Sequence, residues 1–407
     1  MPAAPACLKF LWLCLFTASP PPRAVEPAPE ATPPADAPAP PQADPVVEAY
    51  DWAAERLRVV VLANAANPVS VRLARLYMAQ REIPESALCL LDLPGHSAIT
   101  REQFDRLLAA PIRTWLESSG LWRMDGPVVA HADVRYLVII HGVPLRILAS
   151  NPARALASDT DAASIDSELA CLPMGPHPLP GTLANPFFRS QTPLQTWQNA
   201  HQLIVARLDG PDAATVERMI RAPIAVETGP ALPPVACFDL LDSPVPAHRD
   251  IDRRLQRVAH RLTKAGWNVQ IERTSRAWPP DQPMIPPSIY AGWYSANPSS
   301  PFTSRRFRLP EGAIAVQMHE SAAASLAQAD AGWAATLLAR GAAVTAGTVQ
   351  DTPLPDRLDV PRFLTHLLDG WNVGQASAAA TPSLSTQNVL LGDPLYRPLP
   401  AGIPGDR

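Results

Sequence analysis

The chain has 407 residues and a net charge of −4, with 18% of its residues charged and 6% aromatic. This weak negative charge argues against nucleic acid as the main partner, because phosphate binding requires a basic surface. The 49 prolines are partly explained by the N-terminal region, where many of them gather.

Residues 1–24 have the layout of a secretory signal peptide. Lys9 precedes the apolar run Phe10–Thr17, which is too short to span a bilayer, and small residues and prolines follow. Residues 25–48 are rich in Pro, Ala and Glu and are expected to form a disordered tether. No later apolar run is long enough to cross a membrane, so we expect an exported, soluble protein in the periplasm or outside the cell.

Five cysteines are present, and each has a simple interpretation. Cys14 could accept a lipid, but bulky residues precede it, and a lipid anchor there is disfavoured. Cys89, Cys171 and Cys237 are odd in number and lack metal-type spacing. They are most simply buried small apolar residues, although one disulfide among them stays open.

From residue 49 onward the pattern alternates between buried strands and amphipathic helices, which predicts a doubly wound, mostly parallel α/β sheet with helices on both faces. An N-terminal sub-lobe covers residues 49–149, with strands at 58–63, 87–93 and 134–141 and helices at 69–80 and 101–118. Residues 150–200 break the rhythm as an irregular excursion or lid. A C-terminal sub-lobe covers residues 201–400, with strands predicted at 203–207, 235–240, 268–272, 289–291, 313–318, 342–344 and 388–391. Its helices are predicted at 212–227, 249–264, 360–369 and 374–380, with a further short one around Trp333.

Polar side chains follow two successive strands of the C-terminal sub-lobe. His319, Glu320 and Ser321 come after one strand, and Trp293 and Tyr294 come after the strand before it. Ligands of open parallel sheets bind beyond the carboxyl ends of the strands. We therefore expect the functional site at this edge, covered by the excursion that carries Asp166 and Glu168.

Phrases spread over nearly the whole mature chain resemble an uncharacterised family of exported bacterial proteins found in genomes that carry the exosortase protein-sorting system. They are HGVPLRI (141–147), ASIDSELACL (163–172), NPFF (185–188), ARLDGP (206–211), YAGWYS (290–295), GAAVTAGTV (341–349) and QNVLLGDPLYRP (387–398). The resemblance implies a sorting-related envelope context and no particular reaction.

The order of the C-terminal phrases also resembles the catalytic half of gingipain-like cysteine peptidases, which have a caspase-like α/β sheet. In that family one strand ends in a Gly-His pair and the next in the nucleophilic cysteine. Here Trp293 follows Gly292, and His319 with Glu320 stands near the tip of the next strand. The resemblance therefore implies the fold with its Cys-His dyad replaced, because a thiolate nucleophile needs a cysteine.

Each candidate residue has a functional and a structural interpretation. His319 and Glu320 could act as base and orienting group, and His141, Asp166 or Glu168 could assist, with or without a metal. They could equally bond the backbone or cap a helix. Trp293 and Tyr294 could stack on a ligand or fill the space of the missing histidine, and Asp351 could face the site as a ligand group.

Three functions follow. The first is a peptidase-like protein without the cysteine dyad that binds an unknown envelope ligand or protein at the carboxyl edge of its sheet. The second is a hydrolase with a non-cysteine site built on His319 and Glu320 with His141, Asp166 or Glu168. The third is a structural envelope component. Cofactor and metal requirements are left open by the sequence.

Overall fold

Strands and helices alternate along the chain in the order that the sequence pattern predicts. The computed structural model describes residues 50–126, 128–150, 161–175, 181–194, 201–273, 278, 283–293, 297–299 and 301–404. The long strands are β1 (Val59–Asn64), β2 (Leu88–Leu91), β6 (Tyr136–Ile140), β10 (Ile204–Leu208), β11 (Val235–Asp239), β12 (Asn268–Glu272), β13 (Ile289–Gly292), β14 (Ile314–Gln317), β15 (Thr345–Thr348) and β17 (Asn388–Leu391). The short ones are β3 (Ala98–Ile99), β4 (Trp122–Asp125), β5 (Val128–Ala132), β7 (Arg146–Ile147), β8 (Ala163–Ser164), β9 (Leu183–Ala184) and β16 (Ser383–Leu384). The helices are α1 (Pro68–Arg81), α2 (Arg101–Phe104), α3 (Ala110–Ser118), α4 (Ile165–Ala170), α5 (Ala213–Thr228), α6 (Pro246–Lys264), α7 (Trp333–Ala339), α8 (Val360–Leu368) and α9 (Val373–Ala380).

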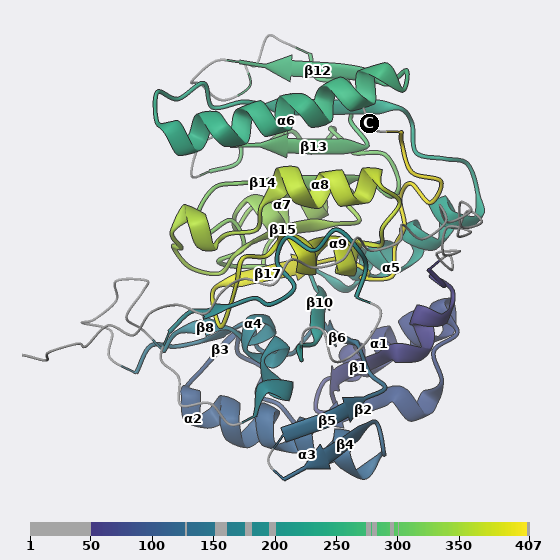
Figure 1. Ribbon diagram of the computed structural model, residues 1–407, viewed down its shortest axis with the longest axis vertical. Coiled ribbons are helices and arrows are strands. Elements are labelled where there is room, and N and C mark those ends of the chain that lie inside the picture. The colour runs from purple at the N-terminus through teal and green to yellow at the C-terminus, as the bar shows by residue number, and fades with distance from the viewer. Residues whose placement is uncertain are drawn as a thin grey trace, which may run out of the picture. The chain divides into compact units, whose positions relative to one another are not determined.

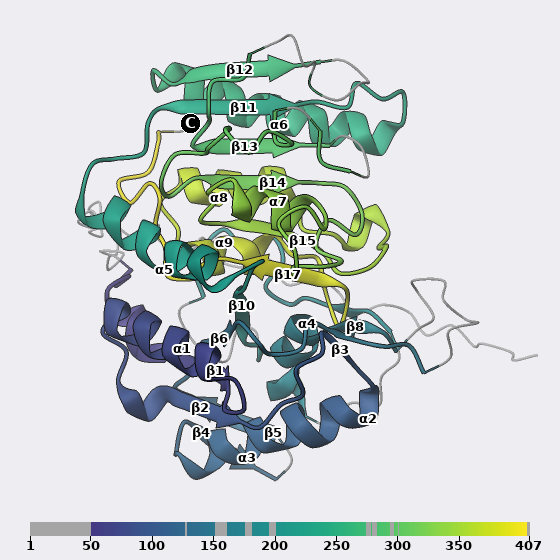
Figure 2. The same ribbon diagram turned by 180° about the vertical axis from the view of Figure 1, so that it is seen from behind.

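The long strands form two sheets that meet edge to edge. Their orders are β12-β11-β13-β14 and β15-β17-β10-β6-β1-β2. A parallel bridge between Ile314 and Val344, just before β15, joins them. Figures 1 and 2 show the strands stacked from β12 at one end to β2 at the other. The doubly wound, mostly parallel fold class is confirmed.

One antiparallel contact reverses the direction of the sheet. β15 pairs with β17 antiparallel, so that Thr345 faces Leu391 and Thr348 faces Asn388. All other pairs among the long strands are parallel. The strands from β12 to β15 therefore run one way and those from β17 to β2 the other. As a result, the carboxyl ends of the two halves lie at opposite edges.

Helices cover both faces, which explains the nearly continuous apolar strands. In β1 every residue is buried, with Val59 and Val61 in one apolar cluster and Val60 and Leu62 in another. Figure 1 shows α6 and α8 in front of the strands β11 to β15, and Figure 2 shows α7 on the reverse side. Among the described residues, none of the helices combines the length and apolarity that a membrane crossing requires.

The polypeptide that follows β17 is fixed beside the antiparallel contact. Gly392 has φ +143°, and a Cβ there would lie 2.9 Å from the carbonyl oxygen of Ala343, so the position favours glycine. Asp393 accepts a hydrogen bond from the Tyr77 hydroxyl at 2.8 Å and forms an ion pair with Arg81 at 2.5 Å. The Tyr396 hydroxyl donates to the Gly312 carbonyl at 2.9 Å. These contacts anchor the segment that follows β17 to α1 and to the loop before β14.

Several local features depart from the predicted elements, among them the strand expected at 342–344, which is observed as β15 at Thr345–Thr348. The helix expected over residues 101–118 is interrupted by a π-turn at Asp105–Ala109, because the ring of Pro111 would clash with the carbonyl of the residue four positions before it. The antiparallel hairpin β4–β5 was not predicted. Its strands are short, and Gly120 and Gly126 beside β4 indicate turns more strongly than a strand.

A buried ion network connects the excursion to the sheet. Arg207 on β10 is fully buried and pairs with Asp166 on α4 at 2.6 Å and with Asp209 at 3.3 Å. Its guanidinium also donates to the carbonyls of Val143 and Pro144. The arginine therefore compensates two acidic groups and ties α4 to the core.

Removal of this arginine should destabilise the fold strongly. Arg207→Ala leaves the buried Asp166 without its ion-pair partner and removes one of the partners of Asp209, and we expect a loss of roughly 3–5 kcal/mol in the free energy of unfolding, measured by urea denaturation. Arg75→Ala is the matched control, because its pair with Glu85 is exposed and should contribute less than about 1 kcal/mol. Similar small losses for both variants would contradict the role of the network.

Candidate functional site

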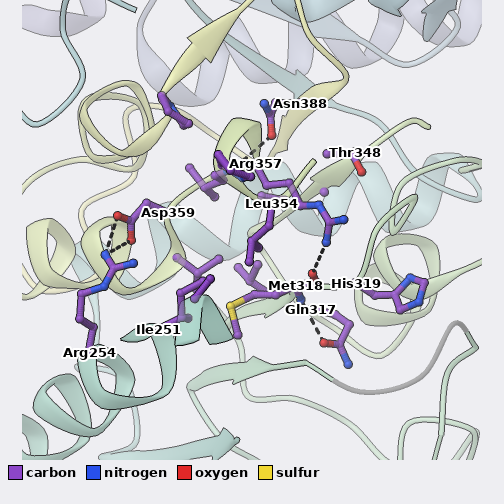
Figure 3. A pocket seen from close by; sticks show the side chains of 18 of the residues that line it. Ile251, Arg254, Gln317, Met318, His319, Thr348, Leu354, Arg357, Asp359 and Asn388 are labelled. Carbon is purple, nitrogen blue, oxygen red and sulfur yellow. Dashed lines mark hydrogen bonds and ion pairs between the residues drawn. The ribbon is translucent and has the colours of Figure 1, made fainter. Parts of the chain in front are cut away.

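A cavity of about 350 Å³ opens at the carboxyl edge of β14 and β15, and we call it the edge pocket (Figure 3). Its size falls in the range typical of small-ligand sites. Its walls come from the ends of β14 and β15, the first turns of α6, the segment that leads into α8, and part of the excursion. The principal lining residues are Phe188, Arg189, Ala247, Ile251, Arg254, Met318, His319, Leu354, Arg357, Leu358 and Asp359.

Two facing helices are held together at the pocket wall. Arg254 on α6 donates to both carboxylate oxygens of Asp359, at 2.7 and 2.6 Å. Asp359 is also the N-cap of α8, because its carboxylate accepts from the backbone N–H of Arg362. Both bonds come from the same guanidinium nitrogen, Nη1, and this ion pair links α6 to the start of α8, so the pocket wall is preformed. Figure 3 shows the pair opposite Met318 and Leu354.

Arg357 holds the tip of β14 in place. Its guanidinium donates to the carbonyls of Thr352 at 2.6 Å and Met318 at 3.2 Å. It also pairs with Glu320 at 2.8 Å, although the Glu320 side chain is 49% exposed. Glu320 is therefore engaged as a partner of Arg357 at the surface.

His319 lines the edge pocket but is turned toward its rim. Its Nδ1 lies within hydrogen-bonding distance of the Glu320 carbonyl oxygen. In Figure 3 the imidazole extends away from Leu354 and Ile251. No residue that the structure describes forms a hydrogen bond with the other ring nitrogen.

Ser321 and Asp351 form a separate pair beside the pocket. The Ser321 hydroxyl donates to the carboxylate of Asp351, and the Ser321 backbone N–H donates to the Thr348 hydroxyl at 2.9 Å. Ser321 has φ 58°, a left-handed conformation that these two contacts stabilise. Asp351 thus organises the loop after β14 and is not among the residues that line the edge pocket.

Trp293 lies at the same sheet edge as His319 but points into the protein. It is 7% exposed, its indole N–H donates to Asp252 on α6 at 2.8 Å, and its ring packs on His248 with centroids 5.0 Å apart. This geometry fits the interpretation that the indole fills space. Tyr294, the other aromatic candidate, lies outside the described residues.

The remaining candidates do not join His319. His141 ends β6 and bonds Asp209 at 2.7 Å, at the edge opposite His319, because the sheet reverses at β17. Glu168 pairs with Arg101 at 3.0 Å and accepts from the Ser385 hydroxyl at 2.7 Å. Asp166 forms an ion pair with Arg207. The expectation that Asp166 and Glu168 cover the sheet edge that carries His319 is therefore not met. Of the described residues of the excursion, Phe188 and Arg189 line the edge pocket.

A buried carboxyl pair escaped the sequence analysis. Asp239 and Glu272 lie side by side at the ends of β11 and β12 and are 2% and 4% exposed. Burial raises the pKa of Asp239 to about 9, and its hydrogen bond with Glu272 adds to the rise. The Tyr290 hydroxyl lies 3.3 Å from Asp239. The sequence signal that could have revealed this pair is the acidic residue Asp239 at the end of the apolar strand β11.

No metal-ion cluster is evident: in the described part of the chain, no three or more His, Cys, Asp or Glu side chains gather closely enough to hold one. The three described cysteines, Cys89, Cys171 and Cys237, are buried and free, with no disulfide among them. Burial raises the pKa of Cys89 and of Cys237 to about 12 and also raises that of Cys171. Each is a neutral, inaccessible thiol at neutral pH.

Solved structures with a similar fold are peptidases. The Arg-specific cysteine proteinase gingipain R matches with a TM-score of 0.50 and 10% identity over 84% of this chain and 78% of that chain. The fold is gingipain-like. The complex of the Porphyromonas gingivalis RgpB pro- and mature domains matches at 11% identity and a TM-score of 0.48, over 84% of this chain and 79% of that chain. No family model matches the sequence, and no curated protein matches it significantly.

At this identity the likeness shows the fold alone. On the gingipain-like sheet of this chain, β13 is followed by Trp293 and β14 by Met318 and His319. None of the described cysteines lines the edge pocket.

The thiols should be unreactive in the folded protein. Iodoacetamide at pH 8 should leave Cys89, Cys171 and Cys237 unmodified and should label all three after unfolding in guanidinium, as read residue by residue by mass spectrometry. Rapid labelling of any of them in the native protein would contradict the assignment of buried thiols.

The Asp239–Glu272 pair should give stability a definite pH dependence. Because folding raises the pKa of Asp239 from about 4 in the unfolded chain, its contribution is complete below pH ~4 and declines as pH rises toward 9. Asp239→Asn removes this titration. From pH 5 to pH 8 the variant should therefore gain more than about 1 kcal/mol relative to the parent in urea unfolding. Parallel pH profiles for the two proteins would contradict this.

Proposed function

We propose that this protein is a gingipain-like protein that binds a polypeptide ligand in the edge pocket and does not cleave it by a cysteine mechanism. The observation that carries the proposal is the preformed, largely apolar pocket at the carboxyl edge of β14 and β15, the edge where ligands of parallel sheets bind. The Arg254–Asp359 ion pair in its wall supports the proposal, because it restrains the two helices that border the pocket.

The lining of the edge pocket combines apolar walls with polar groups, so it can bind an apolar side chain together with the polar backbone of a polypeptide ligand. Ile251, Met318, Leu354 and Leu358 supply apolar walls, while Thr348 and Asn388 bring polar groups to the lining. Burial of one large apolar side chain contributes about 1.5–3 kcal/mol, enough to anchor a short segment when backbone contacts assist. A polypeptide offers both kinds of group.

Hydrolysis at this pocket lacks a ready nucleophile among the described residues. The described cysteines are buried elsewhere, and the Ser321 hydroxyl donates to Asp351. Glu320 pairs with Arg357, and His141, Asp166 and Glu168 have partners away from the pocket. A non-cysteine hydrolase would have to work from His319 and Glu320 alone, and this alternative is an outcome of the experiment below.

The cellular setting is part of the same proposal. A signal peptide over residues 1–24 and a Pro/Ala-rich tether over residues 25–48 would deliver the folded domain to the periplasm or outside the cell. The resemblance to exosortase-associated proteins supports an envelope polypeptide as the ligand. Both segments lie outside the described residues.

The test uses random heptapeptides displayed on phage and selected on the immobilised protein. Selected peptides should share an apolar anchor residue. Ala247 is an exposed residue that lines the pocket, so Ala247→Trp should fill the entrance and weaken binding of the selected peptides at least tenfold. His260→Trp, exposed on the same helix and outside the pocket, is the matched control.

Two results would contradict the proposal. Equal binding by the parent and Ala247→Trp would place the ligand elsewhere. Cleavage of selected peptides, detected by mass spectrometry and abolished by His319→Ala or Glu320→Gln, would instead establish the hydrolase.

A further inference from the structure

A second cavity, of about 480 Å³, opens on the other flank of α6, at the carboxyl ends of β11 and β12. We call it the arginine pocket, because Arg249 and Arg253 of α6 and Arg273, which follows β12, line it. Gln256, Asp242 and Asp252 complete its polar wall. The proposed binding of a polypeptide in the edge pocket does not involve this second cavity.

The guanidinium groups of this pocket have few partners among the residues that the structure describes. Neither Arg249 nor Arg273 makes a side-chain hydrogen bond or ion pair with any residue that the structure describes. Arg253 has one exposed contact with Asp250, at 3.4 Å. Surface contacts of this kind contribute little, so all three groups are available to an anion.

The acidic side chains of the pocket leave a small positive excess. Asp252 is already engaged, since it accepts from the Trp293 indole N–H at 2.8 Å and from the backbone N–H of Asp242 at 3.0 Å. Among the lining residues three arginines stand against two aspartates (3 − 2 = 1), and Asp250, which contacts Arg253 from outside this lining, offsets part of that excess. This balance matches a singly charged carboxylate better than a doubly charged phosphate.

Helix α6 separates the two pockets. Ala247, Ile251 and Arg254 line the edge pocket, whereas Arg249, Arg253 and Gln256 line the arginine pocket. At about 100° per residue these sets lie on opposite flanks of one helix, whose diameter with side chains is about 10–12 Å. An extended polypeptide covers that distance in about three or four residues at roughly 3.3 Å each.

We propose that the arginine pocket binds a carboxylate of the same polypeptide whose apolar side chain enters the edge pocket. The partner is then a segment with an apolar residue and an acidic residue about three or four positions apart, laid across the first turns of α6. This inference rests on the proposed function of the edge pocket, because the apolar anchor sets the position of the acidic group.

The test compares synthetic, acetylated and amidated peptides of sequence Leu-Gly-Gly-Glu and Leu-Gly-Gly-Gln, titrated into the protein by ligand-observed NMR. The Glu peptide should bind about tenfold more tightly, and added salt should reduce the difference. In the double variant Arg249→Gln/Arg273→Gln the preference should vanish. Arg257→Gln, on the exposed face of α6 and outside both pockets, is the matched control and should keep it.

The possible results separate this inference from the proposed function. Equal affinity of the two peptides for the parent would overturn the arginine pocket while leaving the edge pocket intact, provided that Ala247→Trp weakens both. A Glu preference that survives in Ala247→Trp but not in the double arginine variant would overturn the shared-ligand arrangement. Tighter binding when phosphoserine replaces Glu would contradict the carboxylate assignment, and no binding of any peptide would contradict both proposals.

Discussion

The antiparallel pairing of β15 with β17 is the constraint on which the rest of the structure depends. Backbone hydrogen bonding in this one contact reverses the strand direction, so the two halves of a continuous sheet expose their carboxyl ends at opposite edges. One edge carries His319 and the edge pocket, and the other carries His141 with Asp209. His319 and His141 both follow a strand and look equivalent in the sequence, but the reversal of the sheet places them at opposite edges.

Helix α6 is the second organising element, because its flanks serve different cavities. Its buried stripe packs on the sheet, one flank meets α8 through Arg254 and Asp359, and the other presents arginines. The charge on this helix therefore has two roles, one in the geometry of the fold and one in the proposed recognition of a ligand. A gingipain-like fold thus carries a site whose chemistry comes from local side chains and not from the fold itself.

Much of the fold follows from the sequence alone. Short β-branched runs buried on both faces, alternating with amphipathic helices, determine a doubly wound sheet, and each predicted long strand matches an observed one within a few residues. The signal-like pattern of residues 1–24, the Pro/Ala-rich composition of residues 25–48 and the weak net charge are likewise read from the sequence alone. The sequence also locates His319, Glu320 and Trp293 at strand ends, because strand boundaries depend on local periodicity.

Only the tertiary structure decided which of these residues meet. Strand direction across the sheet depends on pairing between segments far apart in sequence, and no local pattern encodes that β17 runs against β15. Nor does local sequence show that Asp166 compensates Arg207, that Asp239 lies beside Glu272, or that Arg254 joins Asp359. These pairs arise from long-range packing, where burial and the partner's charge together determine what a polar side chain does.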